Sequence, residues 1–171
     1  MSSTSRSSGR AASFGSSYEV PPYCVIFTRA KTFSSWVTRF FTKEEWSHTG
    51  VLIQGKVYHS TLGVGCHVSS LKDFLDGTTS EYFIFNPNYS SSSDKISDEE
   101  SRAIECLDKG YDVSLLPEIA SHTRDKEDFE DKEHAMERMV CSEYSEYILF
   151  DTAHSLTPGE LYAIVERQSS K

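Results

Sequence analysis

The chain has 171 residues, a net charge of −9 and a pI near 5.1. This length fits one domain with a tail, and ten Phe, nine Tyr and two Trp residues are enough for one packed core. The acidic balance excludes nucleic acid or an anionic membrane surface as the main partner, because both need basic patches.

The cysteine pattern gives no sign of a metal site. The four cysteines are Cys24, Cys66, Cys106 and Cys141. No two of them form a CxxC pair, and His122 and His134 lack a partner at ligand spacing, so we predict no metal and no other cofactor. No apolar run approaches the roughly 20 residues of a membrane span, and the N-terminus has no apolar signal segment. A cytoplasmic location is therefore the default expectation.

The first part of the chain predicts a tail, a strand and a helix. Residues 1–17 are Ser-rich and are expected to be disordered, which leaves residues 18–171 as the folded domain. Residues 23–27 are typical of a buried strand. In residues 33–41 the aromatic side chains follow the i, i+3, i+4, i+7 spacing of one helix face. This aromatic face belongs to the core or forms one wall of a substrate groove.

Residues 46–59 predict a β-hairpin that carries two histidines. The expected turn is Gly55-Lys56, which pairs His59 with Leu52 and puts His48 on the same face as His59. His48 would then lie about 13 Å along the strand from that pair, at about 3.3 Å per residue. Direct contact between the two imidazoles would need a looser turn, a shifted register or a bulge, for which Gly50 is a natural place.

Further elements follow the hairpin. The expected elements are a strand at 67–70, a helix at 71–75 capped by Ser70 and ended near Gly77, a strand at 81–85 and a helix that starts at a Ser97 capping box and ends at Gly110. Residues 124–138 are dense in charge and predict a solvated helix or an excursion.

The last segments place a cysteine at a helix start. In residues 140–150, Tyr144, Tyr147 and Ile148 share one helix face, so Cys141 lies at or beside the first turn. Residues 156–165 predict a Pro-Gly turn and a final strand or short helix.

This arrangement suggests nucleophilic chemistry. A cysteine attacks as the thiolate, and its pKa falls at a helix N-terminus or beside a protonated imidazole. Cys141 is the candidate nucleophile, His48 the candidate base and His59 the candidate orienting residue. Asn86 and Asn88 are the alternatives to His59.

The order of segments resembles a known family. A strand and an aromatic helix precede WSHTGVLI and VYHST, and a late CSEY helix precedes LTPGELY. This order resembles the YiiX-like group of NlpC-type proteins. The resemblance implies an α+β, circularly permuted papain-like fold, with a small antiparallel sheet packed against helices. It also implies Cys141 as nucleophile, His48 as base and a third polar position at His59. Many YiiX-like sequences are acidic there, and a histidine at this spacing is similar to the lecithin–retinol acyltransferase-like arrangement.

The expected function is therefore a cysteine hydrolase that uses a Cys-His-His triad for acyl transfer. Its substrate would be a peptide or a peptidoglycan fragment, with the Cys141 backbone N–H and a second, unassigned donor stabilising the oxyanion. One alternative is a lipid-directed acyltransferase or thioesterase, with Phe33, Trp36 and Phe40 walling the groove. Another is a non-catalytic binding module of the same fold, although the presence of both Cys141 and His48 counts against it.

Overall fold

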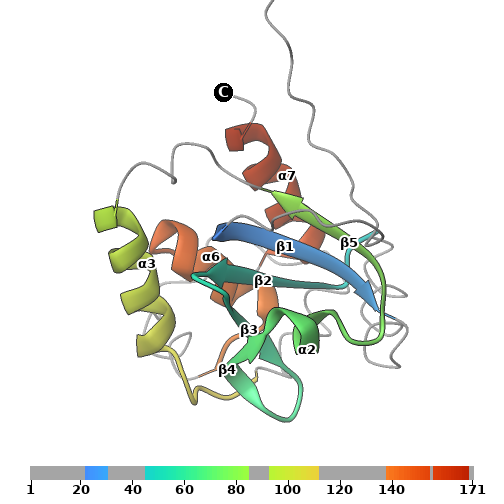
Figure 1. Ribbon diagram of the computed structural model, residues 1–171, viewed down its shortest axis with the longest axis horizontal. Coiled ribbons are helices and arrows are strands. Elements are labelled where there is room, and N and C mark those ends of the chain that lie inside the picture. Colours follow the sequence, from blue (N-terminus) through green and yellow to red (C-terminus); the bar gives the residue numbers. More distant parts are fainter. Residues whose placement is uncertain (1–21, 31–44, 85–92, 112–137, 155, 170–171) are drawn as a thin grey trace, which may run out of the picture.

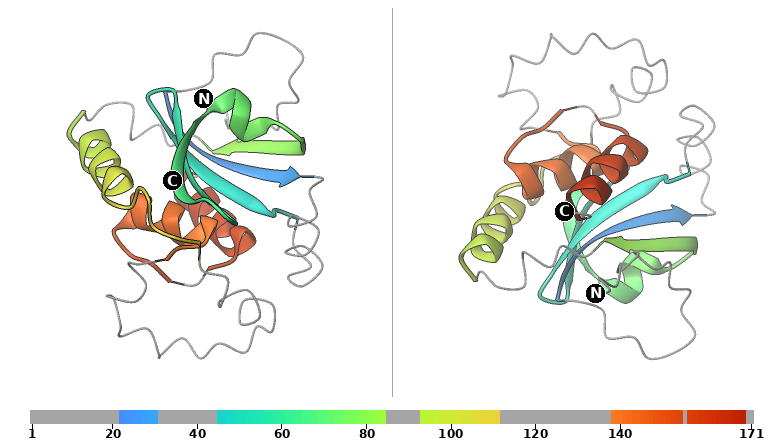
Figure 2. Two further views of the ribbon diagram at one scale, coloured as in Figure 1. Left: turned by 90° about the horizontal axis from the view of Figure 1, so that it is seen from below. Right: turned by 90° about the horizontal axis from the view of Figure 1, so that it is seen from above.

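The protein is an α+β structure built on a five-stranded antiparallel sheet with helices on both faces (Figures 1 and 2). The structure, a computed structural model, describes residues 22–30, 45–84, 93–111, 138–154 and 156–169. The strand order across the sheet is β4-β3-β2-β1-β5. Helices α3, α6 and α7 lie on one side of the sheet, and the short helix α2 lies on the other (Figure 2).

The elements follow the chain as five strands and four helices within the described residues. The strands are β1 Tyr23–Ala30, β2 His48–Ile53, β3 Lys56–Thr61, β4 Gly65–Ser70 and β5 Thr78–Ile84. The helices are α2 Leu71–Leu75, α3 Ser93–Glu105, α6 Cys141–Phe150 and α7 Pro158–Ser169. The expected first strand, hairpin, fourth strand and short helix are confirmed, including the Ser70 cap, whose hydroxyl accepts from the Asp73 N–H.

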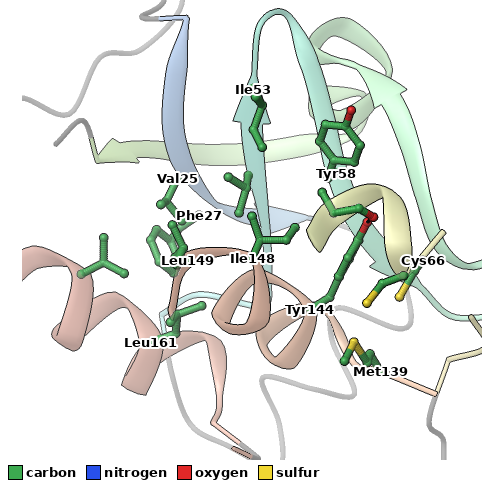
Figure 3. Close-up of a cluster of buried hydrophobic side chains, with 14 of the residues drawn as sticks. Val25, Phe27, Ile53, Tyr58, Cys66, Met139, Tyr144, Ile148, Leu149 and Leu161 are labelled. Carbon is green, nitrogen blue, oxygen red and sulfur yellow. Dashed lines mark hydrogen bonds between the residues drawn. The ribbon is translucent and has the colours of Figure 1, made fainter. Parts of the chain in front are cut away.

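Strand alternation divides the sheet into two packed faces. On the face toward α6 and α7, Val25, Phe27, Val51 and Ile53 join the main core with Ile148 (Figure 3). The opposite face carries a smaller cluster under α2, made of Cys24, Ile26, Leu52, Val57 and Phe74. Burial on both faces explains why the central strands β1 and β2 read as nearly continuous apolar runs.

An aromatic cluster holds the start of β2 in place. Tyr162 of α7 lies 5.3 Å from Phe27 in an edge-to-face arrangement and 5.6 Å from Trp46, measured between ring centroids. Trp46 precedes β2 by two residues and is buried. Such pairs add to the stabilisation gained from burial alone, and here they fix the position of the strand end that carries His48.

The hairpin turn differs from the predicted one by one residue. The turn is Gln54-Gly55, with Ile53 paired to Lys56, instead of Gly55-Lys56. Both turn residues have positive φ, +49° and +83°, as a type I′ turn requires. This turn matches the twist of the two strands, and Gly55 occupies its second central position.

Two other boundaries correct the sequence prediction. Helix α3 begins at Ser93 rather than after Ser97, and no Gly or Pro in residues 93–97 interrupts it. It ends at Glu105, and the left-handed residue beyond it is Asp108 (φ +70°) rather than Gly110, which pairs with Arg138.

The final segment is a helix, because Thr157 and Glu160 form a reciprocal capping box around Pro158. Several predictions fall outside the described residues. These are the tail at 1–17, the helix at 33–41, the positions Asn86 and Asn88, and most of the charged segment at 124–138.

Candidate active site

The hairpin brings His48 and His59 into direct contact. Because the turn lies at Gln54-Gly55, Val51 pairs with Tyr58, and the same register continued places His59 opposite Gly50. His59 is then a diagonal neighbour of His48, within reach of a ring side chain. The His48 Nε2 atom lies 3.1 Å from His59 Nδ1. The predicted separation of about 13 Å was therefore wrong, and the shifted register is the reason.

Gly50 provides the space for this contact, and its ladder with β1 contains no bulge. The ladder between β1 and β2 runs without a shift from Thr28↔His48 to Tyr23↔Ile53, so the bulge suggested for Gly50 is absent there. A Cβ atom at Gly50 would lie 2.9 Å from a Phe74 ring carbon and 3.2 Å from the His59 Cβ. The glycine therefore lets the His59 side chain and α2 approach the backbone of β2.

Three residues that the sequence analysis did not select complete the surroundings of the two histidines. The Ser69 Oγ atom lies 2.9 Å from His59 Nε2. The ring of His67, directly opposite His59 in β4, lies 4.1 Å from the His59 ring between centroids. The Phe74 ring stacks on His48 at 5.3 Å and meets His59 edge-on at 4.8 Å. The available signal was the even spacing of 67 and 69, which puts both residues on one face of a strand.

Cys141 is the first residue of α6, as predicted. Its N-cap is Val140 in an extended conformation, and the Val140 N–H donates to the Glu143 carboxylate at 3.1 Å. The preceding residue is also held, because the Ser60 hydroxyl donates to the Met139 carbonyl oxygen at 2.7 Å. The start of the helix is thus tied to the end of β3.

The thiol of Cys141 lies where β2 and β3 separate. The paired residues of the two strands end at Val51↔Tyr58, so the next hydrogen-bonded pair, Thr49 with Ser60, does not form. The Thr49 backbone instead hydrogen-bonds the Cys141 thiol, while the Ser60 hydroxyl turns to the segment before α6. The nucleophile candidate therefore contacts the residue that follows His48.

The contacts of His48 leave one ring nitrogen available. In the part of the chain that the structure describes, its only hydrogen bond runs from Nε2 to His59, and no hydrogen bond joins its ring to the Cys141 thiol. The Nδ1 atom of His48 has no hydrogen-bond partner among the described residues.

Burial dominates the electrostatics of the thiol. Burial raises the pKa of Cys141 to about 11, although backbone hydrogen bonds from Thr49, Ser142 and Cys141 itself act in the opposite direction. The pKa of Cys24 rises further, to about 12, from burial alone. The expectation of a lowered thiol pKa at the helix start is thus reversed in sign, because Cys141 is only 5% exposed. At neutral pH the resting residue is a thiol.

Burial also keeps the histidines neutral. Desolvation, and then the charge on His67, lower the pKa of His48 to about 4. Desolvation, followed by the charges on His48 and His67, lowers the pKa of His59 well below its usual range. The contact between His48 and His59 at neutral pH is therefore a hydrogen bond between an N–H and a ring lone pair. The arrangement combines a neutral thiol with a neutral, oriented imidazole.

Over the described ranges, no group of three or more His, Cys, Asp or Glu side chains is placed to hold a metal ion. None of the described helices has the length and apolar character needed to cross a membrane. Neither the models of known protein families nor the curated proteins compared with the chain match its sequence.

Proposed function

We propose that the protein is a cysteine hydrolase with a circularly permuted papain-like, NlpC-type fold. In this proposal Cys141 is the nucleophile, His48 the base and His59 the orienting residue. The observation that carries it is the hydrogen bond between the Cys141 thiol and the backbone of Thr49, the residue that follows His48, together with the contact by which His59 holds the His48 ring at Nε2. In this proposal the other ring nitrogen of His48, Nδ1, accepts the thiol proton.

The order of elements supports the fold assignment. The histidine strand comes first, and the cysteine helix follows the sheet and packs on one of its faces. The cysteine occupies the first position of its helix, where backbone N–H groups lack partners within the helix and can stabilise negative charge.

The neutral resting state suggests general-base attack. As the Cys141 sulfur bonds to the substrate carbonyl carbon, its proton passes to His48 Nδ1. The resulting imidazolium keeps its Nε2 hydrogen bond to His59, and the Cys141 backbone N–H stabilises the oxyanion. His48 then gives the proton to the leaving amine, alcohol or thiol as the carbonyl reforms. Water attacks the acyl-enzyme with His48 again as base, which releases the acid and restores the thiol.

Hydrolysis of an amide bond, in a peptide or a peptidoglycan fragment, is the preferred reaction. Transfer of an acyl group from an ester or thioester is the second candidate. The burial of Cys141 favours it, because a site that limits water allows a bound amine or alcohol to compete for the acyl-enzyme.

Covalent trapping tests the proposal. The protein is mixed with a p-nitrophenyl ester and an acyl thioester, and the acylated peptide is located by mass spectrometry. We expect the acyl group on Cys141, no adduct at that position in Cys141→Ala, and acylation slowed about 100-fold in His48→Ala. Cys106→Ala, which removes another buried thiol, serves as the matched control and should react like the unmodified protein.

Acylation spread over Cys24, Cys66 and Cys106, or acylation of Cys141 that does not depend on His48, would contradict the assignment. Once acylation is established, a panel of peptides, peptidoglycan fragments and amine acceptors separates hydrolysis from transfer.

A further inference from the structure

Ser69 lies at the outer end of a hydrogen-bonded row that starts at the proposed base. The row consists of His48, His59 and Ser69, with contacts of 3.1 Å from His48 Nε2 to His59 Nδ1 and 2.9 Å from His59 Nε2 to Ser69 Oγ. His59 is 5% exposed, whereas Ser69 is only partly buried. The row therefore passes through one buried imidazole, His59, between two half-buried residues.

The direction of these hydrogen bonds determines which ring nitrogen of His48 carries a proton and which can accept one. A neutral imidazole has one N–H and one lone pair, so each ring in the row donates on one side and accepts on the other. If His48 Nδ1 is to accept the thiol proton, His48 must carry its own proton on Nε2 and donate it to His59 Nδ1. His59 must then donate from Nε2 to Ser69. With the opposite direction, a proton on His48 Nδ1 would block the transfer.

Apart from Ser69, the described neighbours of His59 do not accept a hydrogen bond from its Nε2 atom. The His67 ring lies against the His59 ring, and Phe74 meets it edge-on, so both hold its plane. The His67 Nδ1 atom is engaged with the Gly65 carbonyl oxygen at 2.8 Å, which requires a proton on that nitrogen. Among the described residues, Ser69 is the hydrogen-bond partner of His59 Nε2.

We propose that Ser69 is a positioning residue. In this proposal its hydroxyl accepts the N–H of His59 Nε2 and turns its own hydrogen toward solvent, because Ser69 is only partly buried, and the row then holds His48 in the tautomer that leaves Nδ1 open to the thiol. The effect on turnover rests on the proposed function, but the effect on the tautomers does not.

Proton–nitrogen correlation spectra of isotope-labelled protein test the tautomers directly, because they distinguish protonated from unprotonated ring nitrogens. We expect the Nε2–H form for His48 and His59 at neutral pH. In Ser69→Ala the two rings should show a mixture of forms, and Ser69→Thr, which keeps a hydroxyl, should restore the single form. Ser169→Ala is the matched control, because the Ser169 hydroxyl bonds the Val165 carbonyl oxygen at the end of α7.

The kinetic counterpart uses the p-nitrophenyl ester. Ser69→Ala should lower kcat about fivefold to tenfold, the equivalent of one neutral hydrogen bond, with KM unchanged. Ser69→Thr should recover kcat, and Ser169→Ala should not change it. A proton on His59 Nδ1 in the unmodified protein, or tautomers unaffected by Ser69→Ala, would overturn the proposal. Expected tautomers in a protein whose Cys141 never becomes acylated would uphold the role of Ser69 and reject the hydrolase.

Discussion

The Nε2 atom of His48 lies 3.1 Å from the Nδ1 atom of His59, on the face of the sheet that α2 covers. Both rings are neutral at neutral pH, because burial lowers the pKa of each. The row of His48, His59 and Ser69 contains no carboxylate. In the proposed reaction, an imidazolium at His48 would thus be stabilised mainly by the negative charge of the oxyanion and by its hydrogen bond to His59. The neutral His48 ring would be a weak base, and its imidazolium form would be a strong acid toward the leaving group.

The buried histidines should make stability depend on pH. Burial, with the charge on His67, lowers the pKa of His48 to about 4 from the ordinary 6.5. Between these values the unfolded chain binds a proton that the folded protein does not, so the free energy of unfolding decreases as pH falls. The slope is at most about 1.4 kcal/mol per pH unit for each such histidine.

Urea unfolding between pH 7 and pH 4 measures this slope for the unmodified protein and for His48→Gln. The variant should lose stability less steeply, because it lacks one of the titrating groups. Carboxylates contribute to both proteins alike, so the difference reports on His48 and on its effect on the pKa of His59. Equal slopes would show that burial does not lower the pKa of His48.

Gly50→Ala should destabilise the protein and disturb the histidine contact. The new Cβ would meet the Phe74 ring at 2.9 Å, a Val57 methyl at 3.0 Å and the His59 Cβ at 3.2 Å. Overpacking of this kind costs about 1–3 kcal/mol. Thermal unfolding gives the loss, and the ring signals of His48 and His59 report the displaced contact.

Gly110→Ala provides the comparison. Its Cβ would lie 3.3 Å from the Arg138 side chain, which is long and can move aside, so the loss of stability should be smaller. Equal losses in the two variants would mean that α2 moves away from Gly50 without cost.

Much of the site follows from local patterns. The hairpin could be predicted because β-branched residues flank a glycine, and the helix start at Cys141 because Tyr144 and Ile148 repeat at helical spacing. The turn register was missed because Gln54 adopts a positive φ, which non-glycine residues rarely do. That one-residue difference decides whether His48 and His59 meet.

Other features depend on tertiary structure and could not be predicted. The roles of His67 and Ser69 follow from the pairing of β4 with β3, a register that the sequence of β4 alone does not specify. The helix start at Cys141 could be predicted, but its burial where β2 and β3 separate could not. This burial reverses the expected direction of the thiol pKa.

Thr49 and Ser60 lie where β2 and β3 separate. Removal of the Thr49 hydroxyl and removal of the Ser60 hydroxyl should have opposite effects on the free energy of unfolding. Thr49 Oγ1 is buried and has no hydrogen-bond partner among the described residues, whereas Ser60 donates to the Met139 carbonyl oxygen. Thr49→Val keeps the shape and the backbone N–H that contacts Cys141, so it should be neutral or stabilising by about 1 kcal/mol. Ser60→Ala should destabilise by about 1–3 kcal/mol, because it leaves a buried carbonyl without its donor. Chemical unfolding of both variants checks this, and a large loss in Thr49→Val would reveal a partner for its hydroxyl.

Removing the charge of Glu143 should change the pKa of the Cys141 thiol without a substitution at Cys141 itself. Burial is the main cause of the raised pKa of Cys141, and the Glu143 carboxylate adds a smaller contribution in the same direction. Glu143→Gln removes the charge but keeps an oxygen that can accept from the Val140 N–H, so α6 should keep its first turn. The pKa of Cys141 should fall by less than about one unit, because burial remains.

The rate of alkylation of Cys141 by iodoacetamide, followed from pH 7 to pH 10 by mass spectrometry, measures this change. In the unmodified protein the rate should rise about tenfold per pH unit without a plateau, as expected for a thiol with a pKa near 11. In Glu143→Gln the curve should move to lower pH, and Glu105→Gln on the exposed side of α3 should leave it in place. A plateau below pH 7 in the unmodified protein would instead indicate a thiolate–imidazolium pair at rest, and His48 would then hold the proton before the substrate binds.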